Sequence, residues 1–288
     1  MSTPSTLLTT LIALVAFVTV VALPARAADY AGPMIDAHSH LPSAAAIDAY
    51  VAAMKRHDVS KVVLLGVGGV QRQDAEWIGA AARKYPDRVI RGTPVPDPTS
   101  NAAAAGLDAA LGDGQARALG EVHVRQVSRQ IDRSPDGPAF LKILEVAARR
   151  KVPVVIHQEL DDKAAAALEK ALAAVPGATV VLAHGGGATP ARLAGLLGRH
   201  ANLRVDLSGM HFQRTPHLAT ESGPLDPAWK ALIEQMPDRF LMGIDVWAPR
   251  LFEPAMLDKL MRWTRRILGE LRPDVAERVA YGNAAALF

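Results

Sequence analysis

The sequence predicts an α/β protein, a single-domain (β/α)₈ TIM barrel, and three observations support this fold class. From Met34 onward, eight short apolar segments rich in β-branched residues alternate with longer amphipathic segments. The short segments are apolar on both faces, which is typical of parallel strands that are buried on both sides. The alternation fills about 250 residues, the usual size of such a barrel.

The strand pattern starts near Met34 and repeats to the end of the chain. We expect strands at 34–41, 61–67, 88–95, 117–124, 152–159, 179–186, 202–209 and 239–247. A doubly wound open sheet is the alternative, but that fold would more naturally place a Gly-rich phosphate loop after its first strand. This chain has His-x-His there, and no linker or change in composition divides it. We therefore expect one domain over 28–288.

Helices are expected between the strands, and several have recognisable N-terminal caps. Ser43, Asp136 and Asp161 each precede a helical run, and Thr189-Pro190 combines a capping residue with proline at the first helical position. Further helices are expected at 71–85, 100–111, 226–237 and 254–270. A last segment, 273–288, has no strand after it.

Residues 1–27 are expected to form a signal peptide rather than part of the barrel. Leu7–Leu23 is an almost continuous apolar run, and Ala25-Arg26-Ala27 fits the small-x-small pattern of a signal peptidase site. No Lys or Arg precedes the run, and the run is long for a signal core, so an uncleaved anchor is the alternative. Cleavage predicts an exported protein, periplasmic or secreted, with no membrane partner.

Charge and cysteine content narrow the expected partners. The formal net charge is +3 over 288 residues and no run of Lys or Arg is present, so nucleic acid is not favoured as a partner. The chain has no Cys, which excludes disulfides and thiolate metal ligands. We expect a small-molecule substrate, and the oligomeric state stays open, a homo-oligomer included.

Polar side chains end several of the expected strands. His38 and His40 project to the same side of the first strand, where two imidazoles form half of a transition-metal site. Four further groups end later strands: Glu121, His157, His184 and Asp245. The carboxyl ends of the strands meet at one mouth of a barrel, where buried unpaired groups are costly. Nitrogen and oxygen donors without sulfur favour Zn²⁺, Mn²⁺ or Fe²⁺ between them.

Each of these residues has a simpler interpretation when it is taken alone. A lone strand histidine such as His157 or His184 is more often a satisfied core residue. Asp245 could cap the loop that follows it, and Glu121 could pair with Arg125. The six together, in the register of a barrel, favour a metal site.

Other residues near the expected mouth are candidates for substrate contact. The expected substrate-binding residues are His123, Arg125, His211 and Trp247. His123 follows Glu121 by two residues and faces the same way, so it could face substrate, support a metal ligand or be structural. Arg125, Arg214 and Arg250 could bind an anionic group, or could simply be solvated.

These motifs resemble those of the amidohydrolase superfamily, most closely its amidohydrolase-related group of metal-dependent hydrolases. The resemblance lies in Asp-x-His38-x-His40, the His of VVIHQ, the His of VVLAHGGG and the Asp of LMGIDVW. The closing segment Tyr281–Phe288 resembles the Gly-Asn-Ala-x-x-Leu tail of that group. Leu-Gly-Glu121 and MIDAHSHL are also similar to TatD-type deoxyribonucleases.

The resemblance implies a set of metal ligands. It implies that His38, His40 and Asp245 bind one divalent metal, and that His157 and His184 bind a second. Glu121 would bridge the two ions and favours two over one, and Zn²⁺ is the expected ion. In single-metal members of the superfamily, one of the later histidines acts on the substrate instead.

The implied activity is hydrolysis of a small ester, lactone, amide or phosphoester by a metal-activated water, with Asp245 as proton acceptor. The first alternative is a metal-dependent decarboxylase of a small carboxylic acid. A TatD-like deoxyribonuclease is a weaker alternative, because the chain lacks a basic, aromatic-rich stretch. An exported metal-binding protein without turnover would need protein ligands at every coordination position.

Overall fold

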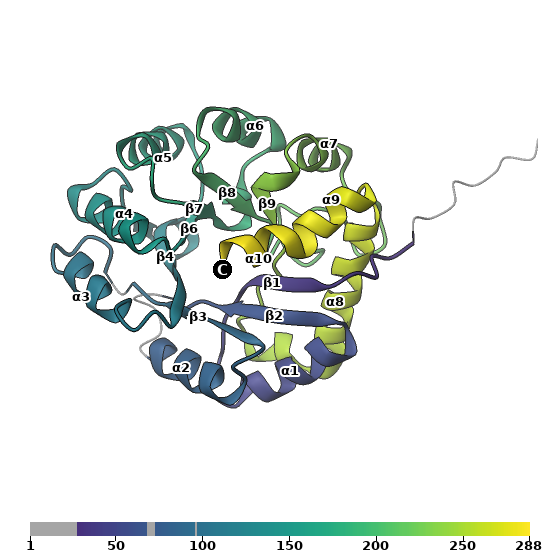
Figure 1. Ribbon diagram of the computed structural model, residues 1–288. Coiled ribbons are helices and arrows are strands. Elements are labelled where there is room, and N and C mark those ends of the chain that lie inside the picture. The colour runs from purple at the N-terminus through teal and green to yellow at the C-terminus, as the bar shows by residue number, and fades with distance from the viewer. Residues whose placement is uncertain (1–27, 68–72, 96) are drawn as a thin grey trace, which may run out of the picture.

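The computed structural model describes residues 28–67, 73–95 and 97–288. The predicted signal segment, 1–27, lies outside the described residues. Eight parallel strands have the bounds β1 (Met34–Ser39), β2 (Val59–Leu64), β3 (Val89–Thr93), β4 (Ala116–Gln126), β6 (Val154–Gln158), β7 (Val180–Leu182), β8 (Leu203–Asp206) and β9 (Phe240–Leu241). They neighbour one another in that order, and helices surround them (Figure 1). The predicted α/β barrel is confirmed.

The barrel is nearly closed, because the chain after β9 runs beside β1. The backbone N–H of Ala37 donates to the carbonyl of Met242 at 3.0 Å, and that of Asp245 donates to the carbonyl of His38 at 2.8 Å. The first strand and the segment that follows the last strand therefore lie side by side, although they are far apart in sequence.

The outer helices lie between the strands as expected. Their bounds are α1 (Ala46–Arg56), α2 (Asp74–Lys84), α3 (Ala103–Ala110), α4 (Pro138–Arg150), α5 (Asp162–Ala174), α6 (Pro190–Arg199), α7 (Pro227–Gln235) and α8 (Pro254–Gly269). No helix in the described part of the chain has the length and apolar character needed to span a membrane.

Two of the predicted caps are confirmed and two are wrong. The side chains of Asp161 and Thr189 accept hydrogen bonds from the backbone of the first turns of α5 and α6. Ser43 is not a cap, because a turn separates it from α1 and the helix starts after Ala45. Asp136 is not a cap either, because its carboxylate accepts the hydroxyl of Ser134 instead.

The C-terminal segment closes the amino end of the barrel. It consists of α9 (Pro273–Glu277), a π-helical stretch (Arg278–Gly282) and α10 (Asn283–Leu287), and the C-terminus lies over the centre of the barrel in Figure 1. Ala284 packs with inward-facing residues from the starts of several strands, among them Ile35.

A short strand that the sequence did not predict lies at the opposite end of the barrel. β5 (Ile131–Asp132) pairs antiparallel with the end of β4, where Arg125 lies opposite Asp132. β4 is thereby extended past the barrel wall and forms one side of the carboxyl-end opening.

Candidate metal centre

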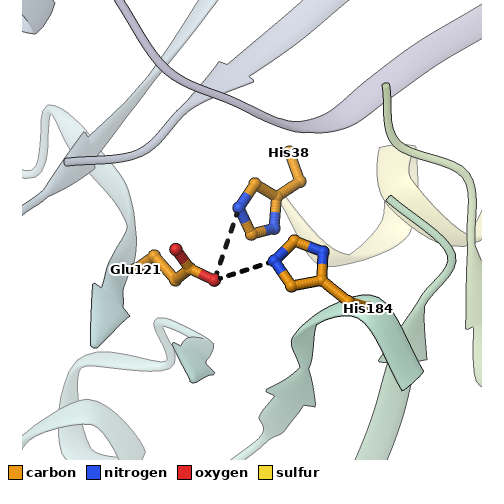
Figure 2. A group of neighbouring side chains, drawn as sticks. All are labelled: His38, Glu121 and His184. Atoms are coloured by element: carbon orange, nitrogen blue, oxygen red, sulfur yellow. Dashed lines mark ion pairs between the residues drawn. The ribbon is translucent and has the colours of Figure 1, made fainter. Parts of the chain in front are cut away.

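The structure brings the six predicted metal ligands together at the carboxyl end of the barrel. They are His38, His40, Glu121, His157, His184 and Asp245. All but His184 are buried. The imidazoles of His38 and His184 both point to one oxygen of Glu121, and their Nε2 atoms are 3.7 and 3.2 Å from its Oε1 (Figure 2).

Strand alternation directs the β4 and β6 side chains into the barrel. Val122 and Val124 pack outward against the helices, and Glu121 and His123, which alternate with them along β4, face inward. On β6, His157 also faces inward, and its Nδ1 is 3.0 Å from Glu121 Oε1. The Nε2 of His123 is 3.0 Å from Glu121 Oε2, so the two oxygens of this carboxylate face different histidines.

Besides the side chains around Glu121, a second group of side chains lies where the end of β1 meets the chain after β9. The Nε2 atoms of His38 and His40 are 3.1 Å apart, and His40 Nε2 is 3.5 Å from Asp245 Oδ1. The backbone bonds between β1 and residues 242–246 hold these groups together. The expectation that both histidines project to one side of the first strand is confirmed.

His184 and Asp245 do not lie on strands, contrary to the expected strands 179–186 and 239–247. β7 ends at Leu182, and His184 lies in a 3₁₀ turn with φ 55°; Asp245 lies beyond β9 with φ 57°. Positive φ is uncommon for residues other than glycine and costs free energy. With this backbone both side chains face the cluster: His184 Nε2 is 3.2 Å from Glu121 Oε1, and Asp245 Oδ1 is 3.5 Å from His40 Nε2.

The imidazoles of β1 are oriented by partners behind them. His38 Nδ1 donates to Asp206 Oδ2 at 2.9 Å, and His40 Nδ1 donates to the carbonyl of Leu65 at 2.8 Å. Each bond fixes the ring and leaves Nε2 toward the cluster, which is how metal-binding histidines are commonly held.

The sequence interpretation missed Asp206, the last residue of β8. Besides His38, its carboxylate accepts the backbone N–H groups of His184 and Ser208 at 3.0 and 3.1 Å. His184 Nδ1 in turn donates to the carbonyl of Ser208 at 2.8 Å. The available signal was an acidic residue at the end of an apolar strand, which is the same signal that identified Asp245.

Asp36 was also missed as a supporting residue, although it belongs to the first-strand motif. Its buried carboxylate accepts the hydroxyls of Ser39 and Tyr50 and the backbone N–H groups of Ile244 and His38. Burial raises the pKa of Asp36 to about 6. This residue ties β1 to α1 and to the chain that precedes Asp245.

The charges of the cluster depend on one another. Burial opposes a charge on Glu121 and would raise its pKa, but His38 and His157 hold that pKa well below its usual range. Burial likewise opposes a charge on His38, yet Asp206 and Glu121 raise its pKa to about 10. With Asp245, three carboxylates surround the histidines, so the donor set is suited to a divalent cation.

Two adjoining cavities open onto the cluster. The one of about 220 Å³ is lined by Glu121, His123 and Trp247, and the one of about 510 Å³ is lined by Arg125. The lining of both includes Arg214, which also forms an ion pair with Asp245. Three of the four expected substrate-contact residues therefore border the opening.

His211 is placed differently from the other candidates. It is buried beside Phe212, with ring centroids 5.7 Å apart, and lines neither cavity. Burial and the charge of Arg214 lower the pKa of His211 to about 4.

The two arginines nearest the cluster, Arg125 and Arg214, have different partners. Arg125 is held by Asp161 at 2.8 Å and by the carbonyl of Glu159 at 2.7 Å. Arg214 pairs with Asp245 and passes close to Gly209 (φ +65°), where a Cβ would contact both its guanidinium and the Asp245 carboxylate.

Comparisons with known proteins agree with this geometry. A family model described as amidohydrolase matches residues 18–288. No curated protein matches the chain in sequence.

Solved structures share the barrel at low sequence identity. The 2,6-dihydroxybenzoate decarboxylase from Rhizobium is 15% identical over 89% of this chain and 98% of its own, with a TM-score of 0.61. The 4-oxalomesaconate hydratase from Rhodopseudomonas palustris is 15% identical over 88% and 95%, with a TM-score of 0.61. A dihydroxybenzoic acid decarboxylase from Polaromonas sp. with bound manganese is 14% identical over 89% and 97%, with a TM-score of 0.61.

These structures show a common fold. The expected similarity to TatD-type deoxyribonucleases is not supported by them or by the family match. The match in sequence covers the whole described barrel and all six clustered residues. The chain therefore belongs to the amidohydrolase family, whose members include metal-dependent enzymes, and its His/Glu/Asp cluster fits a divalent metal.

Proposed function

We propose that this protein is a divalent-metal-dependent hydrolase of a small ester, lactone, amide or phosphoester. The observation that supports the proposal most directly is the position of Asp245. Its carboxylate is buried among the histidines, 3.5 Å from His40 and 3.9 Å from His184, yet it borders the cavity of about 220 Å³. A carboxylate in that position can meet both a cation and a substrate.

The residues that would hold a metal are those whose ligand atoms lie close together. His38, His40 and Asp245 offer ligand atoms that all lie within 4.8 Å of one another, and Glu121 adds a second carboxylate beside them. A divalent cation bound there supplies Lewis-acid polarisation of the scissile group and lowers the pKa of coordinated water. Zn²⁺ is the ion that we propose, and Mn²⁺, present in one structural neighbour, is the first alternative.

The chain's own side chains would then perform the remaining steps. Asp245 accepts a proton from the attacking water and returns it to the leaving group. Burial raises its pKa, but His184 and Arg214 more than offset this and hold the pKa below its usual range, so the carboxylate is ionised at neutral pH. Arg214 lines both cavities and would orient an anionic substrate group.

The test is a panel of esters, lactones, amides and phosphoesters with Zn²⁺- or Mn²⁺-loaded protein. We expect turnover of at least one class, with loss after chelation and recovery after the metal is returned. Turnover that persists undiminished in metal-free protein would refute the proposal.

A metal-dependent decarboxylase is the second candidate. The position of Arg214 beside the cluster favours it. A guanidinium beside the cluster could hold a substrate carboxylate, and several of the structural neighbours are decarboxylases. Release of carbon dioxide from small aromatic carboxylic acids, without hydrolysis of the esters, lactones, amides and phosphoesters, would favour the decarboxylase.

We further propose that the protein is exported, periplasmic or secreted, and functions as one domain over 28–288. Mass spectrometry of the protein from the producing cells should then find an N-terminus near Ala28. An intact Met1 in a membrane fraction would indicate an anchor instead.

A further inference from the structure

A cavity of about 800 Å³ at the amino end of the barrel takes no part in the proposed reaction. It lies toward the starts of β2, β3 and β4, at the end of the barrel opposite the metal cluster. The helix α2 forms one wall and the C-terminal segment forms another. Its volume falls within the range of about 300 to 1,000 Å³ that is usual for sites that bind small molecules.

Basic side chains converge on this cavity from four elements. They are Lys61 of β2, Arg83 of α2, Arg91 of β3 and Arg117 of β4. The described residues that line the cavity include no Asp or Glu. Over the whole chain Lys and Arg outnumber Asp and Glu only by 32 to 29, so this excess of positive charge is local. A cleft lined by charges of one sign concentrates ions of the opposite sign.

Two of the four basic side chains already have partners. Arg91 Nη1 is 3.1 Å from Asp113 Oδ2. The Nε of Arg117 donates to the backbone oxygen of Phe288 at 2.7 Å, which holds the C-terminal segment against β4. These two arginines therefore build the wall of the cavity and are not free to bind a ligand.

Lys61 and Arg83 are the two basic side chains without a partner. Among the residues that the structure describes, neither side chain forms an ion pair or a hydrogen bond. The guanidinium of Arg83 lies over the preceding turn of α2, where a Cβ at Gly79 would be 3.4 Å from its Nη1. Gly79 itself lines the cavity, so the free guanidinium lies beside it.

The wall between these basic side chains is apolar. Ile35 and Ile90 belong to the apolar interior of the barrel, and Tyr281 and Phe288 pack against that interior from the C-terminal segment. Lys61 is the register partner of Ile35 on the adjacent strand, so its side chain starts at the edge of this apolar surface. Apolar walls with a few charged groups suit a ligand that has an apolar body and one charged end.

We propose that this cavity binds a small organic anion, with its carboxylate or phosphate at Lys61 and Arg83 and its apolar body against Tyr281 and Phe288. The inference does not depend on the proposed hydrolase, because the cavity shares no residue with the metal cluster. A ligand held there contacts β2, α2 and the C-terminal segment together, and it therefore stabilises the closed amino end of the barrel.

The test is calorimetric titration of the full-length protein with octanoate and, separately, with octyl phosphate. We expect saturable binding of one equivalent of at least one of these anions, and the tighter of the two identifies the preferred head group. Octylammonium and 1-octanol have the same apolar body without the negative charge. They should bind at least ~10-fold more weakly, because they lose the charged hydrogen bonds.

Three variants locate the binding site. Lys61→Gln and Arg83→Gln should each weaken binding roughly 3- to 10-fold, because each removes one exposed charge from the anion. Ala285→Trp should abolish binding, because Ala285 is an exposed residue of the cavity wall and an indole there would fill the space. Lys142→Gln is the matched control, since Lys142 is an exposed lysine of α4 outside the cavity, and it should bind like the wild type.

Four outcomes would overturn the inference. They are no binding of either anion by the wild type, equal binding of the anions and 1-octanol, undiminished binding in folded cavity variants, and loss of binding in Arg214→Gln alone. The last result would place the anion at the metal cluster instead. Circular dichroism and metal content show whether each variant is folded, and none of these outcomes bears on the proposed hydrolase.

Discussion

The two ends of the barrel are built from the same strands but from opposite kinds of residue. On β6, Val155 packs in the apolar interior near the amino end, and His157, two residues later on the same face, contacts Glu121. On β1, Ile35 packs in the same interior and His38, three residues later and across a register shift, lies 3.7 Å from Glu121. Two or three residues along a strand therefore separate an apolar packing residue from a histidine of the cluster.

Cavity size does not distinguish the two ends. A cavity of about 800 Å³ lies at the amino end, where it is lined by Ile35, Tyr281 and Phe288. The two smaller cavities lie at the carboxyl end. Among the described residues, every group of side chains that could hold a metal borders one of them. The reactive end of the barrel is therefore distinguished by its buried metal-donor side chains and not by cavity volume, as expected for this fold.

The largest expected effect is on turnover at the carboxyl end. Asp245→Asn should lower kcat at least ~1,000-fold, which corresponds to about 4 kcal/mol, because the amide cannot accept the proton. Much of the metal should stay bound through the remaining ligands. Steady-state kinetics and elemental analysis check this, and unchanged activity would remove Asp245 from its role.

At the amino end the expected effect is on stability alone. Ile35→Ala should lower the free energy of unfolding by roughly 3 kcal/mol, because Ile35 is buried against Val63 and Ala284. Urea unfolding measures the loss, and metal content should not change. Val127→Ala, at a 60% exposed position, is the control and should change stability by less than ~0.5 kcal/mol. A loss of bound metal in Ile35→Ala would show that the two ends are not separable.

A smaller effect concerns a carboxylate at the carboxyl end, Asp74, for which no basic partner is found among residues 28–67, 73–95 and 97–288. Burial raises the pKa of Asp74 to about 6 from 3.8, although its carboxylate accepts the N–H of Val67. The native state therefore holds a proton that the unfolded chain has lost, and stability falls as pH rises from about 4 to 6.

Asp74→Asn should remove that dependence. The difference in unfolding free energy between the variant and the wild type should grow by roughly 2 to 3 kcal/mol between pH 4 and pH 7. Denaturant unfolding at both pH values measures it. A difference that is constant with pH would mean that Asp74 has its ordinary pKa.

The smallest expected effect is at the rim. Trp247 is 42% exposed and lines the cavity of about 220 Å³, so Trp247→Ala should raise KM a few-fold and leave kcat and stability unchanged. Trp247→Phe should restore much of the lost affinity. A large fall in kcat with unchanged KM would place Trp247 in the chemistry instead.

The sequence predicted the strand order and the six clustered residues because both follow from local patterns. Short segments that are apolar on both faces mark buried parallel strands, and polar groups where those segments end mark the mouth. The backbone of His184 and Asp245 was predicted wrongly, because their positive φ depends on bonds to Asp206 and to β1.

Supporting residues could not be ranked from the sequence. Asp206 and Asp36 differ from other acidic residues only in what they contact, and those contacts join segments far apart in the chain. The closure of the amino end by α10 is likewise a tertiary feature, because 273–288 has no strand after it to suggest its place.

The central claim is that the carboxyl end of the barrel is a metal centre organised by Glu121. Calorimetric titration of Zn²⁺ into metal-free protein tests it most directly. We predict saturable binding of two equivalents by the wild type and of about one by Glu121→Gln. Absence of saturable binding by the wild type would contradict the claim, and equal binding by the two proteins would contradict the role of Glu121.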